Sequence, residues 1–188
     1  MDDTQIRALY EQSQAIQNQL VAALRSRGPE PIADATLTRP DGRPVQLSEL
    51  FGDHDEMLLV HNMGKGCSYC TLWADGFNGI ADHLANRAAF VLVSPDAPAD
   101  LGSFAAGRSW RFDCASAHGT SFVQDLGYEP KPGVYMPGLS SLLKTADGSI
   151  ERVVHTPMGP GDMYCNLWHM LDLLPRGVNG WEPKYEYA

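Results

Sequence analysis

The sequence predicts an α/β protein with a mixed central sheet, helices on both faces and an additional N-terminal helix. Two apolar runs of strand length, residues 57–61 and 89–94, enclose a segment of helical spacing, which makes a strand–helix–strand unit. Residues 140–155 then form a hairpin pattern around an Ala-Asp-Gly-Ser turn, and a covering helix follows. This order of elements is typical of a mixed sheet covered on both faces.

The first predicted element is a helix over residues 4–27, in which apolar side chains recur at steps of three and four residues. Gly28-Pro29 ends it. We therefore divide the chain into an N-terminal helical extension, residues 1–28, and a main domain, residues 29–188. The leading helix could pack on its own domain or on a partner subunit, so a homodimer is one expectation.

The main domain is predicted to begin with a small hairpin around a Pro-Asp-Gly turn, and a hydroxyl-capped helical turn follows it. Buried strands are assigned where the chain is apolar over strand length, and helices where the spacing returns to three and four. In order, the predicted elements are strands 36–39 and 44–47, a helical turn 48–52, strand 57–61, helix 66–87, strand 89–94, helix 98–107, a short helix 120–126, strands 140–145 and 150–155, and helix 162–174.

Composition and charge exclude several classes of function. The 188 residues are 44% hydrophobic and 20% charged, as in an ordinary globular domain, and the net charge of −9 argues against nucleic acid or anionic membrane as a partner. No apolar run reaches the length of about 18 residues that a membrane span needs. The N-terminal sequence is acidic where a secretory signal would be basic, so a cytoplasmic location is expected.

The motif that carries chemistry is "CSYC" at positions 67–70, between the first buried strand and its helix. Cys70 falls on the apolar face of this helix, whereas Cys67 lies in the exposed first turn. Free amides and the helix dipole should lower the pKa of Cys67 from about 8.5, and Lys65 adds a positive charge nearby. Gly64 and Gly66 allow a tight bend. These features suit an attacking thiol, Cys67, and a resolving thiol, Cys70.

Two other interpretations of the cysteine pair remain open, a metal clip and an inert buried pair. A zinc site usually needs a second close pair, but Cys114 and Cys165 stand alone and are interpreted as small core residues. No metal and no bound cofactor are therefore expected. His61 is interpreted as a strand-end histidine, with proton transfer near Cys67 as the alternative. Asp75 falls on the polar helix face and is expected to be solvated.

Several segments of the chain resemble the thioredoxin-like superfamily. "TLTRPDGRPVQLSELFGD" and "MLLVHNMGKGCSYC" resemble the opening hairpin, first core strand and dithiol of its peroxiredoxin-like and thiol-reductase branches, and "LSSLLKTADGSIERVV" is similar to their closing hairpin. "CSYCTLWADGFNGI" and "NLWHMLDLLPRG" resemble a bacterial thioredoxin-like family of unknown function, over roughly residues 30–185. The resemblance implies a thioredoxin-like fold with Cys67 and Cys70 at the active position.

The chain departs from the superfamily at three places. Ser68 and Tyr69 stand where thioredoxins usually have Gly-Pro. Pro137 is the nearest candidate for the cis-proline that such enzymes place against the dithiol, but it lies about two residues early. Gly64 stands where peroxiredoxins have threonine, which disfavours a fast peroxidase.

The sequence therefore predicts a thiol–disulfide oxidoreductase in which Cys67 attacks and Cys70 resolves. Its electrons would come from a dithiol protein or a small thiol, and its substrate would be a disulfide or a hydroperoxide. Peroxide or organic hydroperoxide reduction of the peroxiredoxin-like type is the enzymatic alternative. A non-catalytic binding or dimerisation module, with a vestigial dithiol, is the alternative from another class.

Overall fold

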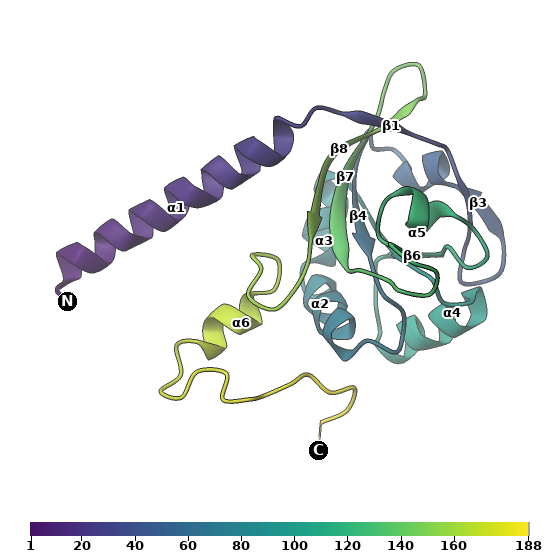
Figure 1. Ribbon diagram of the computed structural model, residues 1–188. Helices are drawn as coiled ribbons and strands as arrows, with labels where there is room; N and C mark the ends of the chain where they lie inside the picture. Colours follow the sequence, from purple (N-terminus) through teal and green to yellow (C-terminus); the bar gives the residue numbers. More distant parts are fainter. Residues whose placement is uncertain (188) are drawn as a thin grey trace.

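The computed structural model describes residues 1–187 and has one mixed sheet of eight strands (Figure 1). The strand order is β1-β8-β7-β4-β5-β6-β2-β3, with β4, β5 and β6 parallel and the other pairs antiparallel. The strands are β1 Glu30–Ile32, β2 Thr36–Thr38, β3 Pro44–Gln46, β4 Glu56–His61, β5 Ala89–Ser94, β6 Asp113–Ser116, β7 Gly138–Lys144 and β8 Ile150–Pro157. The predicted fold class is confirmed.

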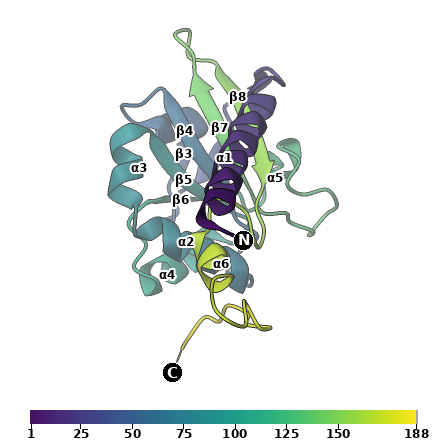
Figure 2. The same cartoon turned by 90° about the vertical axis from the view of Figure 1, so that its left-hand side faces the viewer.

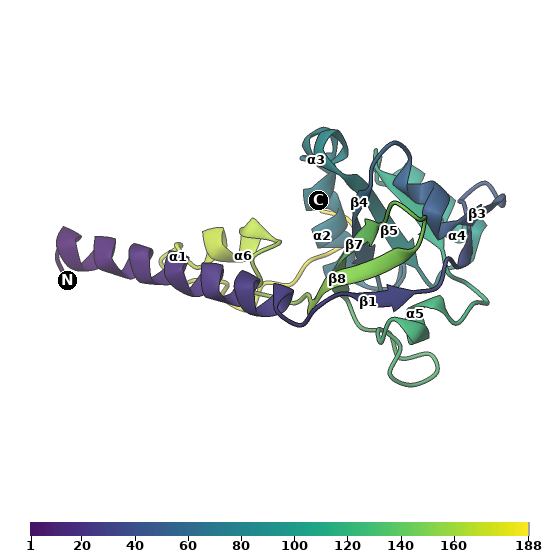
Figure 3. The same cartoon turned by 90° about the horizontal axis from the view of Figure 1, so that it is seen from above.

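Helices cover both faces of this sheet, with α2 and α3 on one side and α5 on the other (Figure 3). The helices are α1 Asp3–Arg25, the short 3-10 helix η1 Leu47–Phe51, α2 Ser68–Asn78, α3 Ala81–Arg87, α4 Pro98–Gly107, α5 Phe122–Asp125 and α6 Asn166–Leu171. No helix within residues 1–187 combines the length and the apolar character needed to cross a membrane.

The central strand β5 shows why the sheet needs cover on both sides. Successive side chains of a strand point to opposite faces, and every residue of β5 is buried. Val91 and Val93 belong to the apolar layer beneath η1 and α5, whereas Phe90 and Leu92 belong to the layer beneath α2 and α4. Such a strand reads as a continuous apolar run, which is why the sequence predicts it well.

The structure corrects two expected helices and adds two strands. The helix expected over 66–87 is two helices, because the chain turns at Gly79 and Ile80. Gly76 and Gly79 both weaken a helix interior at this place. The helix expected over 162–174 is confined to α6. Strands β1 and β6 were not predicted, since β1 is a three-residue edge strand with a central proline and β6 has no β-branched residue.

Helix α1 extends away from the domain, on the same side as α6 (Figures 1 and 2). A capping box starts it: the Asp2 carboxylate accepts from the Gln5 N–H at 2.9 Å, and the Gln5 side chain accepts from the Asp2 N–H at 3.0 Å. Of its residues only Leu24 is buried. The helix is therefore well formed locally but unpacked over most of its length.

Candidate active site

The loop between β4 and α2 is held by the carboxylate of Asp96, which follows the neighbouring strand β5. Asp96 accepts the Lys65 N–H at 2.7 Å and the Ser94 hydroxyl at 2.8 Å. Gly64 has a φ of +103°, and a Cβ at this position would lie 3.1 Å from the Asp96 carboxylate. The predicted tight bend is therefore present at Gly64, and only glycine meets both conditions.

Cys67 is the N-cap residue of α2, and Cys70 lies one turn further along. The Cys67 sulfur accepts the Cys70 N–H at 3.1 Å, and the Cys67 carbonyl accepts the Thr71 hydroxyl at 2.9 Å. Cys67 is half-buried, whereas Cys70 is buried at 7% exposure. The predicted asymmetry of an outer and an inner thiol is thus present, and both cysteines are free thiols.

The pKa values of the two thiols are shifted in opposite directions. The hydrogen bond from the Cys70 side chain lowers the pKa of Cys67 from 9.0 to about 6, helped by the N–H groups of Cys70 and Tyr69 and opposed by partial burial. The same side-chain hydrogen bond, together with burial, raises the pKa of Cys70 far above its usual range. At neutral pH Cys67 is therefore a thiolate and Cys70 a thiol.

The positive charge of Lys65 does not have the role expected from the sequence. Its ammonium group lies 3.0 Å from the Asp100 carboxylate at the start of α4, in an exposed ion pair. The acidity of Cys67 has its causes in hydrogen bonds at the start of α2. The N–H groups at the start of α2 thus contribute to the low pKa of Cys67, whereas the Lys65 charge is not among its causes.

A cavity of about 240 Å³ opens beside the two thiols. Its walls are mostly apolar side chains from β4, α2 and the segments next to β7 and β8. The lining residues are Val60, His61, Asn62, Met63, Cys67, Tyr69, Cys70, Trp73, Pro137, Met158, Gly159 and Pro160. A partly open apolar cavity that contains a thiolate is a place where a small substrate could meet a nucleophile.

Pro137 lies at this cavity because it directly precedes β7. Gly138, the first residue of β7, is opposite His61, the last residue of β4, in the antiparallel register. Pro137 therefore lines the same cavity as the two thiols. No peptide bond within residues 1–187 is cis, so Pro137, the nearest candidate for the cis-proline, is trans.

His61, in the wall of the cavity, belongs to a buried cluster that the sequence did not predict. Its Nε2 lies 2.9 Å from the Ser140 hydroxyl, and its ring stacks on Tyr128 with centroids 3.7 Å apart. Gly138 makes room for this stack, because a Cβ there would collide with the Tyr128 ring. Burial lowers the pKa of His61 to about 3, so the imidazole is neutral. No hydrogen bond joins it to the cysteines, which favours the structural interpretation.

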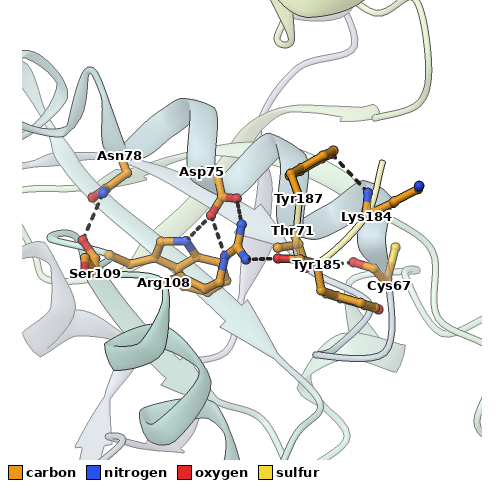
Figure 4. A network of polar contacts seen from close by, with 10 residues as sticks. Cys67, Thr71, Asp75, Asn78, Arg108, Ser109, Lys184, Tyr185 and Tyr187 are labelled. Atoms are coloured by element: carbon orange, nitrogen blue, oxygen red, sulfur yellow. Dashed lines mark hydrogen bonds and ion pairs between the residues drawn. The ribbon is translucent and has the colours of Figure 1, made fainter. Parts of the chain in front are cut away.

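Asp75 is not solvated as expected, but anchors a network that reaches the C-terminal tail (Figure 4). Its carboxylate accepts from the Arg108 guanidinium and from the Trp110 indole N–H, the latter at 2.9 Å. Arg108 also donates to the Tyr185 carbonyl at 2.6 Å. Tyr185 lies near the start of α2, beside Cys67, so the tail borders the site (Figure 4). The partners in these hydrogen bonds are 33 and 77 residues apart in the chain, so no local sequence pattern indicates them.

Asp162 joins α2 to the loop that forms the far wall of the cavity. Its carboxylate accepts the Trp73 indole N–H at 2.9 Å and the backbone N–H groups of Gly159, at 2.8 Å, and Tyr164, at 2.8 Å. Trp73 itself is buried in the apolar layer beneath α2 and α4. The carboxylate that fixes it comes from 89 residues away and was not foreseen.

The other two cysteines are buried in the apolar layer beneath α2 and α4, as expected for small core residues. Burial raises the pKa of Cys114 to about 12 and also raises that of Cys165. Neither residue lines the cavity beside Cys67. Within residues 1–187 no three His, Cys, Asp or Glu side chains come together as a metal site, so the metal-clip interpretation gains no support.

Comparisons with solved structures place this geometry on a known fold. A peroxidoxin, BcpB from Mycobacterium tuberculosis, is 25% identical, with a TM-score of 0.55 over 69% of this chain and 84% of that one. A peroxiredoxin-like protein from Aquifex aeolicus is 14% identical, with a TM-score of 0.55 over 70% and 75% of the two chains. A hypothetical protein from Sinorhizobium meliloti, at 13% identity and a TM-score of 0.51, covers 85% and 88%.

Sequence comparison gives the family. No curated protein matches this sequence. The profile of a bacterial protein family of unknown function, DUF899, matches residues 9–187. Because this match spans nearly the whole chain, the protein belongs to the DUF899 family, and it has a thioredoxin-like fold.

Proposed function

We propose that the protein is a thiol–disulfide oxidoreductase in which Cys67 attacks the substrate and Cys70 resolves the intermediate. The observation that carries the proposal is the thiolate of Cys67, which caps α2 at the wall of an open apolar cavity with the protonated Cys70 one turn away. A partly exposed thiolate with a neighbouring buried thiol is the arrangement that dithiol exchange requires.

The reaction begins when the Cys67 thiolate attacks one sulfur of a substrate disulfide. The substrate S–S bond breaks, its other sulfur leaves as a thiolate, and a mixed disulfide with Cys67 forms. Cys70 then gives its proton to the departing thiolate or to water, and its sulfur displaces the substrate from Cys67. The two electrons of the dithiol pass to the substrate, and a Cys67–Cys70 disulfide remains until a dithiol protein or a small thiol reduces it.

The acidity of the pair sets the order of these steps. The Cys67 thiolate itself is a main cause of the raised pKa of Cys70, through the hydrogen bond between the two sulfurs and through its charge. The mixed disulfide removes that charge, so Cys70 becomes easier to deprotonate only after Cys67 has reacted. Cys70 therefore does not compete for the substrate in the resting protein.

A cytoplasmic, reducing location belongs to the same proposal. Such a compartment returns the dithiol to its reduced form, and it keeps Cys114 and Cys165 as thiols.

The test is a redox titration against glutathione, with free thiols trapped by alkylation and the bridge located by peptide mass. We expect a reversible Cys67–Cys70 disulfide with a potential between roughly −120 and −270 mV, where known exchange proteins lie. Cys67→Ser and Cys70→Ser should each abolish it, and Cys114→Ser, which changes a buried thiol outside the cavity, should not. Absence of this bridge at every glutathione ratio would contradict the proposal and favour a non-catalytic binding module.

Reduction of organic hydroperoxides is the second candidate. It is supported by the likeness to the M. tuberculosis peroxidoxin and by the apolar cavity beside Cys67, which suits an organic group better than a peptide backbone. In this reaction the thiolate attacks the peroxide oxygen, an alcohol leaves, and Cys67 becomes a sulfenic acid. Trapping that sulfenic acid in the Cys70→Ser variant after addition of cumene hydroperoxide would favour this candidate over disulfide exchange.

A further inference from the structure

The surface that the proposed function leaves unexplained is the one formed by α1, α6 and the sheet face between them. We infer that this surface is an interface between two copies of the chain, in which the apolar stripe of α1 packs against the partner copy. The stripe consists of the large apolar side chains of one face of α1, all at least 41% exposed: Ile6, Leu9, Tyr10, Ile16, Leu20 and Val21.

The exposed area of the chain exceeds the area expected for a compact monomer of its mass. A compact protein of 20.6 kDa is expected to expose about 8,900 Å², and this chain exposes 11,269 Å², an excess of about 2,400 Å². One subunit of an obligate homodimer buries about 1,000–2,500 Å². The excess is therefore of the size that one dimer interface would remove.

The stripe continues into a groove that could receive a second helix. The groove has a volume of about 600 Å³ and is lined by Val21 and Leu24 of α1, by apolar residues of β4, β7 and β8, and by Met163 and Tyr164 before α6. Helix α1 and helix α6 project from the same side of the domain (Figures 1 and 3). Because one surface carries both a protruding stripe and a groove, the stripe of each copy can pack into the groove of the other, as two-fold symmetry requires.

The charge pattern favours a second copy as the occupant. Residues 12–24 contain no charged residue, although the chain carries a net charge of −9. Two copies repel one another through that net charge, so they should meet where charge is lowest. Arg25 and Glu56 are the charged residues that line the groove, and Glu56 is already paired with Arg87. The groove therefore contains no unpaired acidic side chain.

The segment beyond the groove adds to this surface. Met170, Leu173 and Leu174, in α6 and just after it, are each more than half exposed. An amphipathic helix gains most of its stability by packing its apolar face, and α1 packs little of it within one chain. An exposed apolar surface of this extent is typical of a protein–protein contact.

The test is the solution mass of the full chain by light scattering over the micromolar range, with two charge variants on α1. We expect twice the chain mass of 20.6 kDa for the wild type. Leu20→Glu places a charge in the stripe and should weaken the dimer at least about 100-fold, since each interface would bury two unpaired carboxylates. Ala15→Glu places the same charge on the opposite face of α1, where none of the residues three or four positions away belongs to the stripe, and should leave the dimer intact.

Circular dichroism and the Cys67 pKa serve as checks that the Leu20→Glu chain is folded, because Leu20 is half exposed within one chain. A wild type that stays monomeric, or a Leu20→Glu dimer as tight as the wild type, would overturn the inference. Neither result bears on the dithiol chemistry, because the glutathione titration of Cys67 and Cys70 does not depend on the mass.

Discussion

Replacement of Cys70 by alanine should change the acidity of Cys67 more than any other single substitution near the site. The Cys70 side chain makes the largest contribution to the low pKa of Cys67, about 6 instead of 9.0. At pH 7 a thiol with a pKa of 6 is about 90% ionised, and one with a pKa of 9 is about 1% ionised, so about 90-fold is the largest possible loss. The backbone N–H groups of residues 69 and 70 remain in Cys70→Ala, so we expect roughly a tenfold loss.

The assay is the absorbance of the thiolate at 240 nm as a function of pH, with Cys67→Ser as the blank. This readout reports ionisation directly, whereas alkylation rates also depend on the nucleophilicity of the thiolate. Cys114→Ala is the matched control, because it removes a buried thiol that makes no contribution to the pKa of Cys67. The reasoning would be refuted if Cys70→Ala titrated at the same pH as the wild type, or if the wild type titrated near pH 9.

Three further substitutions test the surroundings of the site. Gly64→Ala should lower the free energy of unfolding by about 1–3 kcal/mol in a denaturant titration, because of its positive φ and the adjacent carboxylate, whereas Gly66→Ala, whose Cβ meets open space, should be tolerated. The folded pKa of His61, about 3, lies below its unfolded value of 6.5, so its contribution is complete above pH 6.5 and is lost as pH falls towards 3. This amounts to about 2 kcal/mol between pH 7 and pH 5, which His61→Phe should remove. Arg108→Leu should release the Tyr185 carbonyl and speed proteolysis of the tail.

Each of these three predictions has an outcome that would contradict it. Equal costs for the two glycine variants would mean that the loop is not held as described. An unchanged pH dependence in His61→Phe would assign the acid sensitivity to other groups. A tail that is cleaved at the same rate in Arg108→Leu and wild type would show that the network of Asp75 does not hold it.

The parts of the structure that could be predicted are those with a local cause. β4 and β5 are continuous apolar runs because both of their faces are covered. The position of Cys67 at the start of a helix was predicted correctly, and a cysteine there meets free N–H groups whatever surrounds it. The face of Cys70 followed from helical spacing alone.

The parts that could not be predicted depend on residues far apart in sequence. Asp75 has the spacing of a solvated residue, and only the fold brings Arg108 to it. Asp162 lies in a loop, where a carboxylate usually indicates no special role, yet it accepts the Trp73 indole N–H and three backbone N–H groups. The cluster of His61 depends in the same way on the register between β4 and β7.

Because the Cys67 sulfur is the N-cap of α2, the stability of this helix depends on whether the Cys67–Cys70 pair is reduced or oxidised. A thiolate accepts the N–H of Cys70 well, whereas a sulfur within a disulfide is a weaker acceptor, so oxidation should loosen the first turn. A cap of about 1 kcal/mol that exists only in the reduced form shifts a two-electron potential by about 20 mV in the oxidising direction. A partner that binds the start of α2 and changes the stability of its first turn would therefore shift the reduction potential of the pair.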